Sequence, residues 1–139
     1  MAVVHAKLRG SFRTELEMGK HRISADEPPS AGGTDEGPTP YDLLGGALAS
    51  CTAMTLHYYA KREGIPLEEV EVTVAHDRMH AKDCADCLTG EGFIHRFDVK
   101  LAVKGNLTSE QRTRMTAIAK KCPVARTLSS EIKIDHRLS

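Results

Sequence analysis

The chain has 139 residues, a length typical of a single domain, and its 19 basic residues balance 19 acidic ones. It has no basic run and no basic patch studded with aromatic residues, so nucleic-acid binding is not expected. Residues 1–7 lack the apolar core of a signal peptide, and no apolar run is long enough for a membrane span, which favours a cytoplasmic protein. Four cysteines in a reducing compartment then indicate catalysis or metal binding rather than structural disulfides.

The N-terminal residues are predicted to form three short strands and a long loop. Apolar and polar residues alternate over residues 4–8 and 12–18, and a third short strand follows a glycine turn over residues 20–25. Such closely spaced strands predict an antiparallel meander, with the first strand half-buried. Residues 26–39 are rich in proline and glycine and form a loop that is either a plain surface connection or a functional segment.

A long helix is predicted to begin at Pro40 and to end before Gly64. Thr39 suits the N-cap, and Asp42 stands where a capping box places an acid. No charge occurs between residues 43 and 56, so we expect a buried helix. One largely apolar face of this helix contains Leu44, Leu48, Cys51, Thr55 and Tyr58.

Two longer strands and two shorter helices are predicted after the central helix. The strands alternate around residues 70–76 and 93–103, and Thr108 with Gln111 forms a second capping box at the start of a helix. Pro123 suits the first position of a short helix over residues 123–129.

The order of these elements predicts an α+β fold in one domain, residues 1–139, with a mainly antiparallel sheet and a long buried central helix. A last strand is predicted over residues 132–138. The central helix is apolar nearly all round, and Gly45 and Gly46 indicate that another backbone approaches it closely. One small sheet would not cover such a helix, so we expect a homodimer.

Two cysteines are candidates for chemistry. Cys51 lies mid-helix, where a thiol either packs as a small hydrophobe or reacts with the help of a nearby cation. Cys122 precedes Pro123 and is expected to be the N-cap of the short helix, where the helix dipole lowers a thiol pKa. The alternative for Cys122 is the last core residue of the preceding helix.

Three motifs make the chain resemble the OsmC/Ohr family, named for osmotically inducible protein C and the organic hydroperoxide resistance proteins. They are Gly-Gly-Thr-Asp-Glu-Gly-Pro-Thr-Pro at residues 32–40, the cysteine-bearing helix at 43–53, and Cys-Pro-Val with Arg-Thr-Leu at 122–128. The resemblance implies an intertwined homodimer with a thiol site near the subunit interface. It implies a cofactor-free peroxidase that reduces organic hydroperoxides at the expense of a dithiol, with Cys51 as peroxidatic and Cys122 as resolving cysteine. The alternative is a non-enzymatic homodimer that binds an apolar ligand or zinc.

The chain departs from the family pattern in the residues that surround the thiols. In the family, a glutamate that pairs an active-site arginine follows the proline at the helix start, whereas Tyr41 stands there in this chain and Asp42 follows it. The resemblance makes Arg13, Arg22 and Asp42 the candidates for stabilising the thiolate. Ala125 stands where many relatives of the closest subgroup carry histidine.

A second pair of cysteines, Cys84 and Cys87, lies between the two long strands and lacks a counterpart in the family pattern. The pair could supply two of the four ligands of a zinc ion, with His80 and His95 from the flanking strands as the others. It could instead be a redox dithiol, although no helix N-terminus is expected there to activate it. The remaining alternative is two inert loop thiols.

Overall fold

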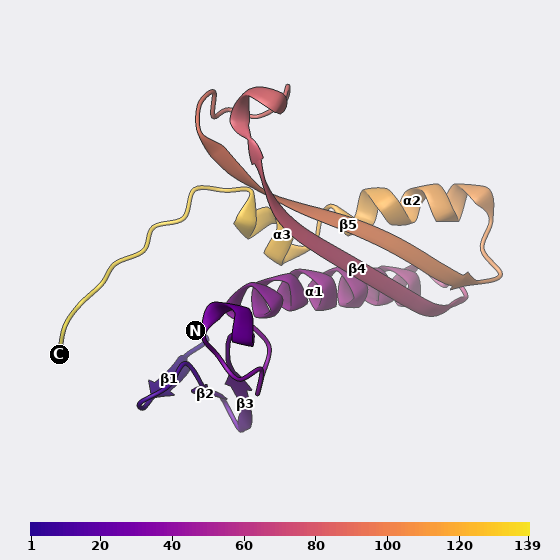
Figure 1. The fold of residues 1–139 in the computed structure, drawn as a ribbon. Coiled ribbons are helices and arrows are strands. Elements are labelled where there is room, and N and C mark those ends of the chain that lie inside the picture. The colour runs from indigo at the N-terminus through magenta and orange to yellow at the C-terminus, as the bar shows by residue number, and fades with distance from the viewer. The chain divides into compact units, whose positions relative to one another are not determined.

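The computed structural model describes residues 1–139, which divide into two compact units, residues 1–44 and residues 45–139 (Figure 1). The first unit contains a three-stranded antiparallel sheet and the second a two-stranded antiparallel sheet with helices. The predicted α+β class with antiparallel pairing is therefore confirmed.

The sheet of the first unit has the order β1 (Val4–Leu8), β2 (Thr14–Met18), β3 (His21–Ala25). Gly19 has a φ of 62°, the left-handed conformation that a tight turn between β2 and β3 requires. The three predicted strands are confirmed. The prediction that the first strand is half-buried was wrong, because β1 is an edge strand and all five of its residues are exposed.

Residues 26–39 connect this sheet to the long helix α1 (Pro40–Glu63) and include a single 3-10 turn, η1 (Pro29–Ala31). The helix begins with the predicted capping box. The backbone N–H of Asp42 donates to the Thr39 hydroxyl at 3.1 Å, and the backbone N–H of Thr39 donates to the Asp42 carboxylate at 3.0 Å. The helix ends at Glu63, and Gly64, with a φ of 66°, is the left-handed closing residue that follows it.

In the second unit, a long hairpin packs with α1 and α2. Its strands are β4 (Leu67–His80) and β5 (Phe93–Gly105), joined by a loop that contains η2 (Ala81–Asp83). The helix α2 (Ser109–Ala119) begins with the predicted capping box between Thr108 and Gln111. Figure 1 shows the hairpin running across α1 and extending beyond the helices towards its loop. The core of buried residues that α1 and α2 share contains Leu56, Ala60, Met115, Ile118 and Ala119.

The buried stripe of α1 differs from the predicted face. The buried residues recur at every fourth position, and they are Leu48, Thr52, Leu56 and Ala60. Tyr58, which was predicted to share the apolar face, is 66% exposed, and Met54 is 69% exposed. The prediction was wrong by about one position because the helix is apolar on several sides, so its sequence did not specify which side contacts the hairpin and α2.

Residues 129–139 were predicted to contain a strand, and this prediction was wrong for the single chain. After α3 (Pro123–Leu128), no residue belongs to a strand or helix. Ile132, Ile134 and Leu138 alternate as a strand would, but they are exposed. A strand needs a neighbouring strand to pair its backbone groups, and the chain offers none to this segment. None of the helices combines the length and the apolar character that crossing a bilayer requires.

Candidate thiol site

The second unit brings together the two cysteines that are not in a disulfide. Cys51 lies on α1 and is half-buried, whereas Cys122 lies between α2 and α3 and is 0% exposed. Their side chains are within hydrogen-bonding reach of each other. The sequence placed them 71 positions apart, so only the packing of α1 against the segment that follows α2 makes them neighbours.

The position of Cys122 follows from local backbone chemistry. It is the N-cap of α3, as predicted, and Pro123 takes the first helical position. Its carbonyl accepts from the backbone N–H of Arg126 at 3.1 Å, which is the first hydrogen bond of α3. The Cys122 side chain makes no capping hydrogen bond, but the backbone N–H groups of Val124 and Ala125 at the start of α3 lower the pKa of its thiol.

The two thiols have pKa values shifted in opposite directions. Burial raises the pKa of Cys51, and the hydrogen bond to Cys122 raises it further. Burial would also raise the pKa of Cys122, but the hydrogen bond from Cys51 and the backbone N–H of Ala125 outweigh it, so the pKa falls below the ordinary thiol value. When the pair carries one negative charge, the charge therefore resides on Cys122 and the remaining proton on Cys51.

Two threonine hydroxyls complete the surroundings of the thiols, and the sequence reasoning missed both. The buried Thr52 donates to the carbonyl of Leu48 at 2.7 Å, and it also helps to lower the pKa of Cys122. Thr55 donates to the carbonyl of Cys51 at 2.7 Å and acts on the Cys51 thiol in the same sense. A hydroxyl has one hydrogen, so each threonine can donate either to its helix carbonyl or to a thiolate. Both threonines could have been singled out from the sequence, because each is a hydroxyl residue within about one helical turn of Cys51 on the predicted apolar helix.

A pocket of about 400 Å³ adjoins the segment around Cys122. Thr52 and Ala125, whose groups act on the Cys122 thiol, both line it. The rest of its wall is largely apolar with two cations, and it contains Leu48, Val99, Leu101, Thr116, Ala119, Lys120, Arg126 and Ser129.

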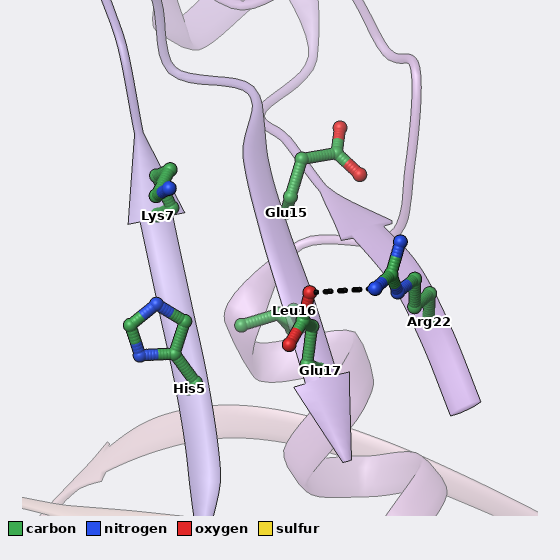
Figure 2. A pocket seen from close by; sticks show the side chains of 6 residues that line it. All are labelled: His5, Lys7, Glu15, Leu16, Glu17 and Arg22. Carbon is green, nitrogen blue, oxygen red and sulfur yellow. Dashed lines mark ion pairs between the residues drawn. The ribbon is translucent and has the colours of Figure 1, made fainter. Parts of the chain in front are cut away.

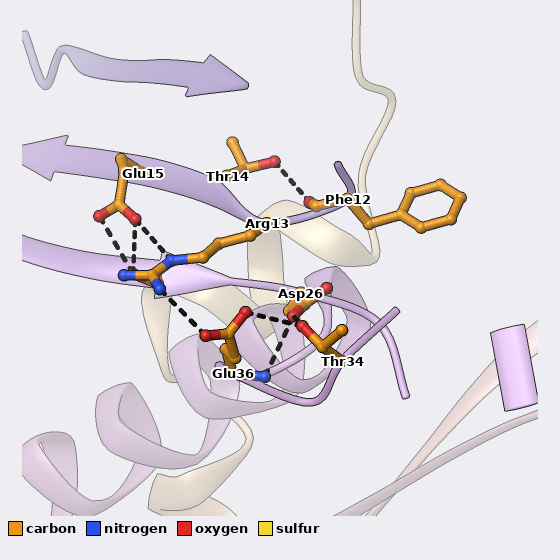
Figure 3. Close-up of polar contacts among 8 residues, drawn as sticks. Phe12, Arg13, Thr14, Glu15, Asp26, Thr34 and Glu36 are labelled. Carbon is orange, nitrogen blue, oxygen red and sulfur yellow. Dashed lines mark hydrogen bonds and ion pairs between the residues drawn. The ribbon is translucent and has the colours of Figure 1, made fainter. Parts of the chain in front are cut away.

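In the first unit, Arg13 is fixed between two carboxylates (Figure 3). Its Nε lies 2.9 Å from Glu15 and its guanidinium lies 3.2 Å from Glu36. The hydrogen bond with Glu15 and the charges of both glutamates raise the pKa of Arg13. Glu36, four residues before Pro40, is a partner that the sequence reasoning did not single out.

The other two predicted thiolate-stabilising residues also have partners within residues 1–44. Arg22 pairs with Glu17 at 3.2 Å, and both line a polar pocket of about 390 Å³ together with His5, Lys7, Glu15 and Leu16 (Figure 2). Asp42 is part of the capping box of α1. The assignment of Arg13, Arg22 and Asp42 to the thiolate stays a prediction.

The loop that precedes α1 is organised by a buried carboxylate, Asp26, which is 3% exposed. It accepts hydrogen bonds from the backbone N–H of Glu27 at 2.7 Å, from that of Glu36 at 3.1 Å, and from the Thr34 hydroxyl at 3.0 Å (Figure 3). The backbone donors, Glu36 first, hold the pKa of Asp26 below its ordinary value. A Cβ at Gly33 would overlap the Glu27 carbonyl, so the loop requires glycine there.

The loop of the β4–β5 hairpin holds Cys84 and Cys87 in a disulfide, with Asp86 Oδ1 at 3.2 Å from Cys84 Sγ. The predicted zinc ligands from the flanking strands have other partners. The His80 ring packs on Phe93 with centroids 4.5 Å apart, and His95 Nδ1 lies 2.9 Å from His76 Nε2. The structure therefore joins the two cysteines but does not bring His80 and His95 to them.

Comparison with known proteins decides the family. The profile of the family described as OsmC-like protein matches residues 33–137, about three quarters of the chain. This chain belongs to the OsmC-like protein family. The resemblance inferred from the cysteine motifs is thereby confirmed, and the Cys84–Cys87 disulfide is an addition to the motifs that carry it. No functionally curated protein is significantly similar to the chain.

Solved structures show the same OsmC-like fold at low sequence identity. An OsmC-like protein from Mycoplasma pneumoniae is 19% identical, with a TM-score of 0.74 over 93% of this chain and 87% of its own. A protein from Psychrobacter arcticus 273-4, described as a putative osmotic stress induced and detoxification response protein, is 22% identical, with a TM-score of 0.71 over 91% and 88%. An organic hydroperoxide resistance protein from Legionella pneumophila is 19% identical, with a TM-score of 0.68 over 92% and 88%.

Proposed function

We propose that this OsmC-like protein is a thiol-dependent peroxidase that reduces organic hydroperoxides with Cys51 as the peroxidatic and Cys122 as the resolving cysteine. The observation that carries the proposal is the direct contact between the only two cysteines outside a disulfide. The description of the Legionella pneumophila relative as an organic hydroperoxide resistance protein supports the same substrate class.

The difference in exposure supports the division of roles. A peroxide must reach the sulfur that attacks it, and Cys51 is partly exposed whereas Cys122 is 0% exposed. Cys122 is the ionised member of the pair and therefore the nearest acceptor for the Cys51 proton. Because the pKa of Cys122 is the lower of the two, this transfer is uphill, and the attack on peroxide draws off the small fraction of Cys51 thiolate that forms. Proton transfer within this hydrogen bond produces the Cys51 thiolate without a separate histidine.

The reaction then proceeds in two steps that balance. The Cys51 thiolate attacks the terminal oxygen of the hydroperoxide, the O–O bond breaks, Cys51 becomes a sulfenic acid, and the alkoxide takes a proton to leave as an alcohol. The sulfur of Cys122 attacks the Cys51 sulfur, forms the disulfide and expels hydroxide, which leaves as water. Two thiols and one hydroperoxide thus give one disulfide, one alcohol and one water, and an external dithiol restores the thiols.

The pocket beside Cys122 suits the organic part of such a substrate. Its volume of about 400 Å³ and its largely apolar wall, which includes Leu48 and Val99, favour an alkyl or aryl group over hydrogen peroxide. The same pocket favours the second candidate function, a non-enzymatic protein that binds an apolar ligand.

We propose that the working form is a homodimer. The support is the apolar surface that one chain leaves exposed, namely Met54 and Tyr58 on α1 and the alternating Ile132, Ile134 and Leu138 near the C-terminus. Burial of such surface against a second copy would provide the cover that the central helix lacks in one chain.

Peroxide titration followed by mass spectrometry tests the function. We expect the wild type to consume cumene hydroperoxide with a dithiol reductant and to form a Cys51–Cys122 disulfide after one equivalent. Cys51→Ser should lose turnover, and Cys122→Ser should accumulate sulfenic acid on Cys51. Turnover retained by Cys51→Ser, or oxidised wild type without that disulfide, would contradict the assignment. A chain that shows no turnover but co-purifies with an apolar ligand would establish the binding function instead.

A further inference from the structure

We infer that the Cys84–Cys87 disulfide opens under a dithiol reductant into a zinc-binding site, with the two thiolates and the Asp86 carboxylate as its protein ligands. Each of the three side chains offers one ligand atom, and these atoms all lie within 4.8 Å of one another. They belong to the loop between β4 and β5, at the end of the hairpin that extends beyond the helices (Figure 1). The site is therefore separate from the thiol pair of Cys51 and Cys122.

Backbone hydrogen bonds that do not depend on the disulfide hold this loop in shape. The N–H of Ala81, a residue only 2% exposed, donates to the carbonyl of Gly92 at 2.8 Å and closes the loop at its base. The N–H of Cys84 donates to the carbonyl of Ala81 at 3.1 Å, and the N–H of Cys87 donates to that of Cys84 at 3.4 Å. Because none of these bonds involves sulfur, we expect the ligand residues to stay close together when the disulfide is reduced.

The separations within the loop are compatible with a tetrahedral zinc ion. Two thiolates at about 2.3 Å from such an ion lie about 3.8 Å apart, and a thiolate and a carboxylate oxygen bound at about 2.1 Å lie about 3.6 Å apart. Cys84 Sγ is 3.2 Å from Asp86 Oδ1, and the Cα atoms of the two cysteines are 5.5 Å apart. Once the S–S bond is broken, rotation of the cysteine side chains about their Cα–Cβ bonds is enough to separate the sulfurs, and the backbone can stay in place.

Reduction and metal binding are two balanced steps. Both cysteines are half-buried rather than enclosed, so a reductant can reach them. A dithiol breaks the S–S bond by thiol–disulfide exchange, which leaves the two cysteines as thiols and oxidises the reductant to its own disulfide. Zinc then replaces the two thiol protons, which pass to solvent, and binds the thiolates. The divalent ion also compensates part of the three negative charges that two thiolates and a carboxylate bring into one loop.

The ligand types favour zinc and leave one of its coordination positions open. Thiolates are soft ligands that suit zinc, whereas magnesium and calcium prefer oxygen ligands. The two histidines that the sequence suggested have other partners, since His80 packs on Phe93 and His95 lies against His76. Water takes the fourth position, as it does in zinc sites with three protein ligands.

Zinc titration of the full chain, reduced with a phosphine that is not itself a thiol, tests the site, with Asp83→Asn as the matched control. Asp83 is in the same loop, but its carboxylate is not part of the cluster. We expect the reduced wild type and Asp83→Asn to bind zinc alike at this site. Cys84→Ser and Cys87→Ser should each lose this ion, and Asp86→Asn should bind it about tenfold more weakly or not at all. Circular dichroism would establish that each variant is folded.

Absorption spectroscopy with Co(II) gives a second readout, in the Cys51→Ser/Cys122→Ser background so that Cys84 and Cys87 are the only cysteines. We expect the reduced chain to show thiolate-to-cobalt charge-transfer bands and the visible bands of a tetrahedral ion, and zinc to displace them. The oxidised chain should show neither, because the sulfurs of a disulfide are not thiolates.

Four results would overturn the inference. They are a reduced wild type that binds no zinc, an oxidised chain that binds as strongly as the reduced one, binding by Cys84→Ser, Cys87→Ser or Asp86→Asn equal to that of the reduced wild type, and a loss of affinity in Asp83→Asn as large as that in Asp86→Asn.

Discussion

Cys51 and Cys122 interact directly through their thiols, and the interaction raises the pKa of Cys51 and lowers the pKa of Cys122. The buried member of the pair is the one that ionises more readily, because the hydrogen bond from Cys51 and the backbone N–H groups at the start of α3 replace solvent around it. When one of the two thiols is ionised, the pair carries one negative charge and the two sulfurs share the one remaining proton.

The thiolate titration should show two widely separated steps. Cys84 and Cys87 are in a disulfide, so thiolate absorbance near 240 nm reports only Cys51 and Cys122 in the oxidised hairpin. We expect the first thiolate below the ordinary thiol range, which is about pH 8.5, and the second above it. Cys51→Ala should raise the pKa of Cys122, because it removes the strongest of the hydrogen bonds that lower it. A single two-thiol step at the ordinary pH would contradict the coupling.

Thr52→Val should raise the pKa of Cys122 while changing little else. The substitution keeps the shape of the buried side chain and removes the hydroxyl that can donate to the thiolate. The Thr52 hydroxyl also donates to the Leu48 carbonyl, which is already a hydrogen-bond acceptor within the helix. Loss of this second hydrogen bond should therefore change the free energy of unfolding by about 1 kcal/mol or less. Thr55→Val is the matched control, since Thr55 acts on Cys51. An equal shift of the first titration step in both variants would show that the assignment of the two hydroxyls is wrong.

Asp26 should make the stability of the first unit depend on acid pH. Its folded-state pKa is lowered by backbone donors, so its stabilising contribution is present above the ordinary value of about 3.9 and is lost as the pH falls through the lower folded value. We expect Asp26→Asn to lower the unfolding temperature at pH 7 and to remove part of its decrease below pH about 4. Asp35→Asn in the same loop is the control, because asparagine tolerates the left-handed backbone of Asp35, whose φ is 54°. Identical melting curves of Asp26→Asn and wild type at pH 7 would refute this role.

Gly46→Leu should have opposite effects on an isolated chain and on the proposed dimer. Within residues 45–139, a Cβ at Gly46 would meet no atom within 4 Å, and leucine improves helix propensity by about 1 kcal/mol. An isolated chain should therefore tolerate or gain from the substitution. In a homodimer that buries about 2,000 Å² or more around α1, the added side chain should weaken assembly by overpacking. Analytical ultracentrifugation of the wild type, Gly46→Leu and the loop control Gly90→Ala measures this. A folded wild-type monomer at micromolar concentration would exclude the dimer.

The sequence by itself determined the features that depend on neighbours within about one helical turn. The capping boxes at Thr39 and Thr108 follow from side chains that reach backbone groups three residues away, and both are present. The N-cap position of Cys122 follows from Pro123 at the first helical position. The strands β1 to β5 follow from alternation along the chain in the same way. The motifs around the two cysteines were also sufficient to identify the family.

Only the tertiary structure decided which distant groups meet, because such contacts depend on how whole elements pack rather than on local spacing. Periodicity left several faces of α1 equally apolar, so packing chose the stripe that includes Thr52 and brought Cys51 to Cys122. Strand register puts His95 opposite Arg78 and diagonal to both His76 and His80, and side-chain packing decides that the His95 ring contacts His76 while the His80 ring packs on Phe93. The opposite pKa shifts of the two thiols arise from burial and hydrogen bonds that exist only once α1 and α3 are in contact.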